Sequence, residues 1–278
     1  MNATMRFLRH QSSTFRNESL FPAEYDLAVE ELLEIYIDDI PYAVTMRSPG
    51  DDLNLAAGFC FSEGIVDSWS DFLSIEHCPS AGNQSRVLIR LKQARSSNAE
   101  PGSSNKPYVS KSSCGLCGKE RSSDVFVDLR PVPAQDRIYL SDIWLLKSAY
   151  DHKQELFKIT GATHSASIFD RGQNVLAFAE DIGRHNALDK AIGRLLREDK
   201  LQDAYLAIVS SRLSFEMVQK AGRAGLQIIS GLSAPTSMAV SMAEELNITL
   251  IGFLRDKSLT IYTHPERIIT DHSAAKNF

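Results

Sequence analysis

The stretch NVLAFAEDIGRHNALDKAIG at residues 174–193 contains the pattern that decides the fold. It opens with an apolar run, which is typical of a buried strand, and continues through a polar turn over residues 181–185. Apolar residues then recur at helical spacing and share one face: Ala187, Leu188, Ala191, Ile192, Leu195 and Leu196. The stretch therefore predicts a strand that leads directly into an amphipathic helix.

The same strand-to-helix order occurs twice more along the chain. The run AYLAIVS at 204–210 leads through Ser211 and Arg212 into a helix, and LQIIS at 226–230 leads through 231–235 into another. That helix is expected to end near Asn247, before a further strand. Continuous apolar strands alternating with amphipathic helices indicate a sheet covered on both faces. We therefore predict a layered α/β/α domain over residues 137–278.

The beginning of this domain shows two further patterns. Ser141 and Asp142 are suited to cap a helix that runs to about Lys158. Two apolar runs at 165–169 and 174–179 flank the turn residues DRGQ, which predicts a hairpin.

The first half of the chain predicts a smaller α+β domain over residues 26–136, preceded by a flexible polar arm over 1–25. Strands are expected at 32–37, 42–46, 74–77 and 86–91. Between them, the SPGD sequence is suited to start a helix, and Gly64 is suited to end it.

A change in composition interrupts this domain. Residues 93–113 contain seven serines, two prolines and one glycine, and such a segment cannot bury enough apolar surface to order itself. We expect a mobile loop over 93–121 that carries the sequence CGLCG, with Cys114 and Cys117.

Composition limits the class of protein. The 278 residues are 43 % hydrophobic and 23 % charged, and 30 basic residues against 35 acidic ones give a net charge of −5. This is globular composition, and a mildly acidic chain is a poor candidate for general nucleic-acid binding. No apolar run approaches the roughly 18 residues that cross a bilayer. Together with an N-terminus that lacks a secretory pattern, this predicts a cytoplasmic protein with no membrane or nucleic-acid partner.

The paired thiols are the first candidate for chemistry. Lys111, Lys119 and Arg121 flank Cys114 and Cys117, and neighbouring cations favour the thiolate over the thiol. Four interpretations stay open on the residues alone: half of a zinc site, a thioredoxin-like redox pair, a nucleophilic or sulfur-carrying thiol, or two incidental cysteines. The other two cysteines, Cys60 and Cys78, are expected to be small core residues.

The second candidate is the set of strand-to-helix turns. In layered α/β folds ligands bind at the carboxyl ends of strands, where helix N-termini present N–H groups to anions. Arg184, His185 and Arg212 lie in these turns, which favours a nucleotide-like or polyphosphate ligand. Neither GxxxxGK[ST] nor GxGxxG occurs in the sequence. His164 is interpreted as a structural histidine, and no metal site is expected.

Several strings of the sequence, in this order, strongly resemble the FdhD/NarQ family of formate dehydrogenase accessory sulfurtransferases. They are MRSPGDDLNLAAGFCFSEGIV (46–66), SSCGLCGK (112–119), TGATHSA (160–166), EDIGRHNALDKAIG (180–193), SSRLSFEMVQKAG (210–222), SAPTSMA (233–239) and GFLRDKSLTIYTHPERI (252–268).

The resemblance implies a specific function. Family members take persulfide sulfur from a cysteine desulfurase and pass it to the molybdenum bis(molybdopterin guanine dinucleotide) cofactor of formate dehydrogenase. The sulfur carrier would be Cys114, with Cys117 assisting, and a guanine nucleotide would mimic part of the cofactor. The family's cofactor-contacting segment matches Phe253, Leu254, Arg255, Asp256, Lys257 and Ser258. The resemblance also implies a C-terminal domain similar to the cytidine deaminase fold without its zinc, and a homodimer.

Two other functions stay open at this point. A non-catalytic chaperone would bind the molybdenum cofactor without carrying sulfur. A zinc-structured binding module would need more ligands than the sequence offers near Cys114.

Overall fold

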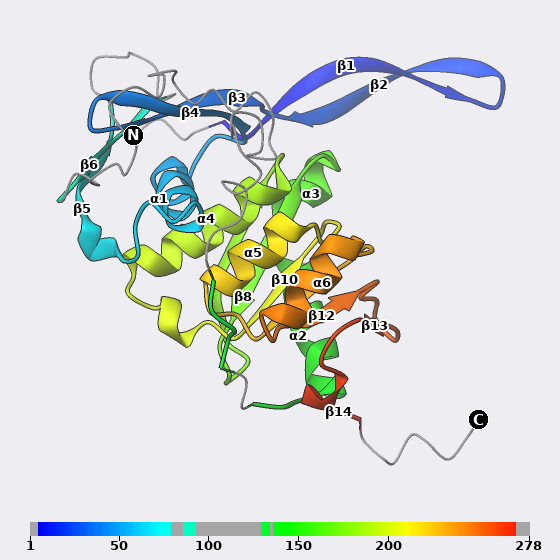
Figure 1. The fold of residues 1–278 in the computed structure, drawn as a ribbon. Coiled ribbons are helices and arrows are strands. Elements are labelled where there is room, and N and C mark those ends of the chain that lie inside the picture. The colour runs from blue at the N-terminus through cyan, green and yellow to red at the C-terminus, as the bar shows by residue number, and fades with distance from the viewer. Residues whose placement is uncertain (1–4, 79–85, 93–128, 134–135, 271–278) are drawn as a thin grey trace, which may run out of the picture.

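The computed structural model describes residues 5–78, 86–92, 129–133 and 136–270. These residues form a mixed α/β protein with two main sheets and a projecting hairpin (Figure 1).

The larger sheet has six strands in the order β13-β12-β11-β10-β8-β9. Strands β10, β11 and β12 are mutually parallel, whereas β8, β9 and β13 each join in antiparallel fashion. The bounds are β8 (His164–Phe169), β9 (Val175–Asp181), β10 (Leu206–Val209), β11 (Ile228–Gly231), β12 (Thr249–Gly252) and β13 (Thr260–Ile261). The predicted hairpin is confirmed as β8 and β9, with Gln173 in the left-handed region at its turn.

Helices cover both faces of this sheet. On one face α4 (Arg184–Arg197), α5 (Phe215–Arg223) and α6 (Ser237–Glu245) bury their apolar stripes, and Figure 1 shows them side by side. On the other face α2 (Leu140–Lys153) packs Ile143, Leu146 and Tyr150 against the strands. The predicted strand-to-helix units and the layered arrangement are confirmed for the described residues.

The smaller sheet has the order β4-β3-β6-β5, and it forms with α1 what we call the N-terminal unit. Its elements are β3 (Glu31–Ile37), β4 (Ile40–Arg47), α1 (Asp52–Ser62), β5 (Phe72–His77) and β6 (Arg86–Leu91), as predicted within a few residues. Helix α1 crosses α4 at a point where two glycines meet. A Cβ atom on Gly58 or Gly193 would lie 1.9 Å from a backbone oxygen of the other helix, so the close crossing requires glycine at both positions.

The polar arm predicted over residues 1–25 is wrong for the part that the structure describes. Residues 7–28 form a long hairpin of β1 (Phe7–Arg16) and β2 (Ser19–Ala28), paired along all ten positions. These strands lack a regular alternation of polar and apolar residues, because few of their side chains are buried, so the sequence carries no strand signal there.

The single helix predicted from Ser141 to Lys158 is also wrong in detail. Helix α2 starts at Leu140 without a side-chain cap, and a break at Gln154 separates it from α3 (Glu155–Thr160). The break has a cause on another element, because the Glu180 carboxylate of β9 accepts the N–H groups of Leu156 and Phe157 at 2.9 and 2.8 Å. The Glu180 carboxylate thus accepts the N–H groups that would otherwise donate to carbonyl oxygens of a preceding helical turn.

Short elements complete the described chain: η1 (Trp69–Asp71), η4 (Leu201–Asp203), η5 (Pro265–Arg267), and the paired β7 (Ile138–Tyr139) and β14 (Ile268–Ile269). Within the ranges given above, no helix has the length and apolar character needed to cross a membrane.

Candidate functional site

The carboxyl ends of β9, β10 and β11 meet at one edge of the six-stranded sheet. Strand β8 runs the other way, so its first residue, His164, lies at the same edge. We call this edge the strand-end rim. It comprises His164, Ser210, the turns at 182–184, 211–214 and 231–235, and the segment 253–258 that follows β12. Such an edge is the usual place for ligands in layered α/β folds.

Arg184 is the first residue of α4 and lies on the rim. Gly183 precedes it with extended backbone, and no side chain caps this helix N-terminus. The Nε atom of Arg184 is buried yet has no hydrogen-bond partner among the described residues. A buried, unpaired guanidinium nitrogen is costly unless an acceptor reaches it, so Arg184 is suited to bind an anionic ligand.

His185, the next predicted site residue, has a different environment. Its Nε2 lies 3.1 Å from a carboxylate oxygen of Glu216 on α5, and the ring is 5 % exposed. Burial on its own would raise the pKa of Glu216, but the hydrogen bond and charge of His185, together with the Ser214 hydroxyl, hold that pKa below its ordinary value. The pair therefore ties α4 to α5 beneath the rim and leaves His185 little access to a ligand.

The other two turns differ in what they offer. Arg212 is exposed at the end of β10, where it is free to reach a ligand. The N-terminus of α6 is already capped, because the Thr236 hydroxyl accepts the N–H of Ala239 at 3.3 Å. Of the three predicted anion-facing turns, those before α4 and α5 remain without a side-chain cap.

His164 belongs to the rim, although the sequence favoured a structural role. Its Nδ1 lies 3.0 Å from the hydroxyl of Ser210, which also accepts the backbone N–H of Ser165. Burial, followed by the charges of Arg184 and His185, lowers the pKa of His164, so the ring is neutral at pH 7. In the sequence, the only indication that His164 could belong to a site was its position as a polar residue at the start of a buried strand.

A pocket of about 620 Å³ opens beside His164 on the face covered by α2 and α3. Its apolar lining includes Phe157 and Leu232, which suits the flat ring of a heterocycle. Polar groups at its edge can accept or donate hydrogen bonds. The lining residues are Asp151, Gln154, Phe157, Lys158, Gly161, Ala162, Thr163, His164, Ser210 and Leu232.

The predicted cofactor-contacting segment at 253–258 lies next to this pocket. Leu254 donates its N–H to Gly231, and a guanidinium nitrogen of Arg255 donates to the carbonyl of Leu232. Phe253 is exposed and has a positive φ, whereas Leu254 is fully buried and anchors the segment. The structure therefore places this segment on the rim, about 70 residues along the chain from Arg184.

Three polar members of the segment have little burial. Asp256 pairs with Lys147 of α2 at 3.1 Å, and Lys147 also contacts Asp151 of the pocket lining. Lys257 is exposed, as is Ser258, whose carbonyl accepts the N–H of Arg255. This geometry fits a ligand that extends from the pocket across the exposed segment.

Cys114 and Cys117 lie outside the described residues, so the thiol prediction has no structural test here. Cys60 is fully buried in the core, as predicted, and burial raises the pKa of its thiol. Cys78, directly after β5, is half-buried and lies outside the hydrophobic core, so the core prediction is wrong for this residue. In the described ranges, no group of three or more His, Cys, Asp or Glu residues is arranged to hold a metal ion.

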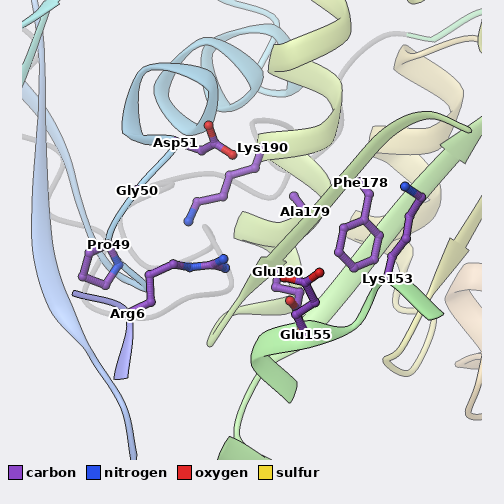
Figure 2. Close-up of a pocket in the computed structure, with 10 residues that line it drawn as sticks. All are labelled: Arg6, Pro49, Gly50, Asp51, Lys153, Glu155, Phe178, Ala179, Glu180 and Lys190. Carbon is purple, nitrogen blue, oxygen red and sulfur yellow. The ribbon is translucent and has the colours of Figure 1, made fainter. Parts of the chain in front are cut away.

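A second, polar pocket of about 450 Å³ lies where the N-terminal unit meets the outer strand β9 (Figure 2). Figure 2 shows the Lys190 side chain reaching from α4 toward the turn at 49–51. Lys190 is 3 % exposed and is already held by Asp181 at 2.7 Å and by the carbonyl of Ser48 at 2.8 Å. Because its buried charges are paired, this pocket is a weaker candidate for anion binding than the rim.

Comparisons with known proteins agree on one family. A model of the FdhD/NarQ family matches residues 28–269. The chain is 39 % identical over 269 residues to a protein of Sulfurisphaera tokodaii named sulfur carrier protein FdhD, covering 95 % of this chain and 100 % of the relative. A protein of Nocardia farcinica with the same name is 39 % identical over 245 residues, covering 87 % and 88 %.

A solved structure has the same fold. It comes from Desulfotalea psychrophila and is described as a candidate formate dehydrogenase accessory protein. The TM-score is 0.77 at 22 % sequence identity, with 95 % of this chain and 100 % of the other covered. At that identity the likeness supports the fold alone.

Proposed function

Because the chain belongs to the FdhD/NarQ family, we propose that it is a sulfur carrier in the maturation of formate dehydrogenase. In this proposal a cysteine desulfurase donates sulfur to Cys114, and the molybdenum bis(molybdopterin guanine dinucleotide) cofactor is the substrate that receives it. The names of the relatives support sulfur carriage, and the family resemblance supplies the donor and the acceptor.

The sulfur step needs a thiolate. The Cys114 thiolate attacks the terminal sulfur of the desulfurase persulfide, the S–S bond of that persulfide breaks, and the desulfurase leaves as a thiolate. One persulfide is consumed and one is formed, so no external oxidant or reductant is required. The lysines and arginine that flank the CGLCG sequence favour the reactive thiolate.

The rim is the proposed place of the acceptor, and one observation carries this assignment. Segments that are distant in the sequence converge there: the pocket at His164, the unpaired Nε of Arg184 and the exposed segment at 253–258. A guanine dinucleotide offers flat heterocycles, which suit the pocket, and phosphates, which suit Arg184 and Arg212. We infer that the cofactor lies along this edge.

The carrier step is tested by mass. The purified, unreduced protein is incubated with a cysteine desulfurase and free cysteine, and its intact mass is measured. We expect a gain of one sulfur atom that is lost on reduction and absent in Cys114→Ala. The Cys117→Ala variant is the matched control, since it leaves the proposed carrier in place. A gain that persists in Cys114→Ala would contradict the assignment.

The acceptor site is tested with GDP as the probe. Arg184→Met should weaken GDP binding about tenfold or more, since a charge-assisted hydrogen bond to phosphate contributes about 1.5–3 kcal/mol. Arg194→Met is the matched control: Arg194 lies on the same helix, where its partner is the surface residue Glu198. Equal affinity in both variants would remove Arg184 from the site.

The alternative, a chaperone that binds the cofactor without carrying sulfur, gives a distinct outcome. It predicts GDP binding that depends on Arg184, with no mass gain in the wild-type protein. The two experiments together therefore separate carriage from binding.

A further inference from the structure

Strand β9 is the outer strand of the six-stranded sheet. It pairs with β8 on one side and, within the described ranges, with no strand on the other. Successive residues of such a strand direct their N–H and C=O groups alternately toward the neighbouring strand and away from it. The outward-directed groups of β9 can therefore be identified from the hydrogen bonds of β8.

The outward-directed residues of β9 are Phe178 and Glu180. Ser165 of β8 turns its backbone toward β10, because its carbonyl accepts the N–H of Ser210 and its own N–H donates to the Ser210 hydroxyl. Glu180 lies opposite Ser165, so its N–H and C=O point away from β8. Phe178 lies opposite Ser167, two residues further along β8, and points the same way.

These outward backbone groups are open where the strand passes Phe178 and Glu180. Among the residues that the structure describes, no backbone hydrogen bond joins either residue to a further segment. Ser48 closes the edge only beyond this point, where it donates its N–H to the Asp181 carboxylate and accepts the N–H of Ile182. A row of unpaired N–H and C=O groups is a template for another strand.

The open edge borders the polar pocket of about 450 Å³ (Figure 2). Residues 178–180 form one wall of this pocket, and Arg6 and the turn at 49–51 contribute to the wall across from it. The pocket therefore provides space beside the unpaired backbone groups. It shares no lining residue with the pocket at His164, so the two can be tested independently.

The charges of the pocket favour an acidic occupant. The Glu180 carboxylate is already satisfied by two backbone N–H groups, and Lys190 is paired with Asp181. By contrast, the side chains of Arg6, Lys153 and Glu155 have no ion pair or hydrogen bond to any described residue. Two cations against one carboxylate leave an excess of one positive charge. Figure 2 shows Arg6 extending into the space beside β9.

We propose that the edge of β9 binds an extended, acidic peptide segment of a partner protein as an added strand. Main-chain hydrogen bonds to Phe178 and Glu180 would hold the segment, and Arg6 would select a carboxylate side chain. The distance from residue 178 to residue 180 is about 7 Å along an extended chain, so three consecutive peptide residues cover it.

The test is an NMR titration of the full chain with the pentapeptide Thr-Val-Glu-Val-Thr, acetylated and amidated at its ends. We expect the amide signals of Phe178 and Glu180 to shift, with a dissociation constant of about 1 mM or lower. Hydrogen exchange at these two amides should slow as peptide is added. Exchange at Ala177 and Ala179, whose N–H groups point toward β8, should change little.

Two variants test the strand addition. Phe178→Pro should abolish peptide binding because it removes an outward N–H, and proline is tolerated at edge positions of this kind. Phe178→Ala is the matched control, since it keeps the N–H and should keep most of the affinity. If Phe178→Pro does not fold, peptides that are N-methylated at alternate residues give the answer on the wild type. Methylation of one alternate set should abolish binding and methylation of the other should not.

The acidic preference is tested with Arg6→Gln. This variant should bind the glutamate peptide about three- to fivefold more weakly and bind a glutamine version of the peptide as the wild type does. Arg16→Gln is the matched control, because Arg16 is exposed at the tip of the hairpin of β1 and β2, outside the pocket. Equal affinity of the wild type for the two peptides would overturn the acidic assignment.

Three other results would overturn the proposal. The first is the absence of any shift up to about 10 mM peptide. The second is binding that survives Phe178→Pro in a folded chain. The third is protection of Phe178 and Glu180 that rises with protein concentration without peptide, which would place a second copy of the chain on this edge.

Discussion

Helix α4 contributes charged residues to two regions that differ in how those charges are satisfied. At the junction with the N-terminal unit, Asp181 accepts hydrogen bonds from Ser48, Gly183 and Asn186 and pairs with Lys190. At the strand-end rim, one turn away, the buried Nε of Arg184 has no partner within the described chain. Asp181, Lys190 and Arg184 all come from the single string EDIGRHNALDK.

The difference distinguishes charged groups that stabilise the fold from charged groups that are able to bind a ligand. Buried ions are tolerated when neighbours replace the water they lose, and Asp181, which is fully buried, has every such neighbour. The junction also contains Asp189, which binds Lys220 at 2.8 Å and Ser62 at 2.7 Å. Hydrogen bonds and ion pairs between completely paired groups join the two units, whereas the unpaired Nε of Arg184 at the rim can still bind a ligand.

The largest expected effect concerns the helix crossing that brings the units together. Gly193→Ala should cost about 3 kcal/mol or more, because the new Cβ would lie 1.9 Å from the carbonyl oxygen of Asn54, which belongs to the backbone. The control is Gly222→Ala on α5, where the nearest atom is a methyl group of Leu246 that can move. Urea unfolding should show a much smaller loss for Gly222→Ala. Equal losses would mean that the crossing is not rigid.

Next in size is removal of the central carboxylate of the junction. Asp181→Ala should reduce the free energy of unfolding by about 3–5 kcal/mol, since it leaves the buried Lys190 ammonium without its counter-charge. Chemical denaturation measures the change. A loss below about 1 kcal/mol would show that the network does not hold the units together.

A smaller effect is expected from His164 as pH falls. Its pKa is lowered in the folded chain, so the unfolded chain binds the proton more readily. The neutral ring therefore makes its full contribution to stability when the pH is above 6.5, the ordinary pKa of histidine. This contribution is lost as the pH falls through 6.5 toward the lower pKa of the folded chain. Solvent screening keeps the effect below about 1 kcal/mol.

The comparison for that effect is His164→Asn, measured by denaturation at several pH values between neutral and mildly acidic. The wild type should lose more stability than the variant over this range. Parallel curves would show that another group is responsible.

The smallest expected effect belongs to the exposed cation of the rim. Arg212→Ala should change the free energy of unfolding by less than about 0.5 kcal/mol, because the side chain is exposed. Denaturation checks the stability, and GDP binding, which we expect to weaken, checks the role. A large loss of stability would place Arg212 with the junction residues instead.

Much of the fold followed from local pattern. The apolar runs and helical stripes from residue 164 onward are long and regular, and they gave the strand-to-helix units of the C-terminal half correctly. The hairpin of β1 and β2 was missed because its strands are mostly exposed, so burial could not impose the alternation that reveals a strand. The break at Gln154 was missed because its cause, Glu180, lies on a different element.

For the site, the sequence predicted Arg184 and Arg212, and the family resemblance added the 253–258 segment. All of them lie at the strand-end rim, and their role in binding stays a prediction. The sequence could not show that His185 pairs with Glu216 or that His164 borders a pocket, because both depend on residues that are distant along the chain. The assignment of Cys114 and Cys117 stays a prediction.

Contiguous residues were enough to predict the order of the elements from residue 164 onward and the family, because periodicity and local strings are properties of neighbouring positions in the chain. The folded arrangement was needed to show which charges of EDIGRHNALDK are paired and that His164 borders a pocket. Both depend on atoms brought together from distant segments, and the free energy of a buried or exposed group is set by those neighbours rather than by its own residue type.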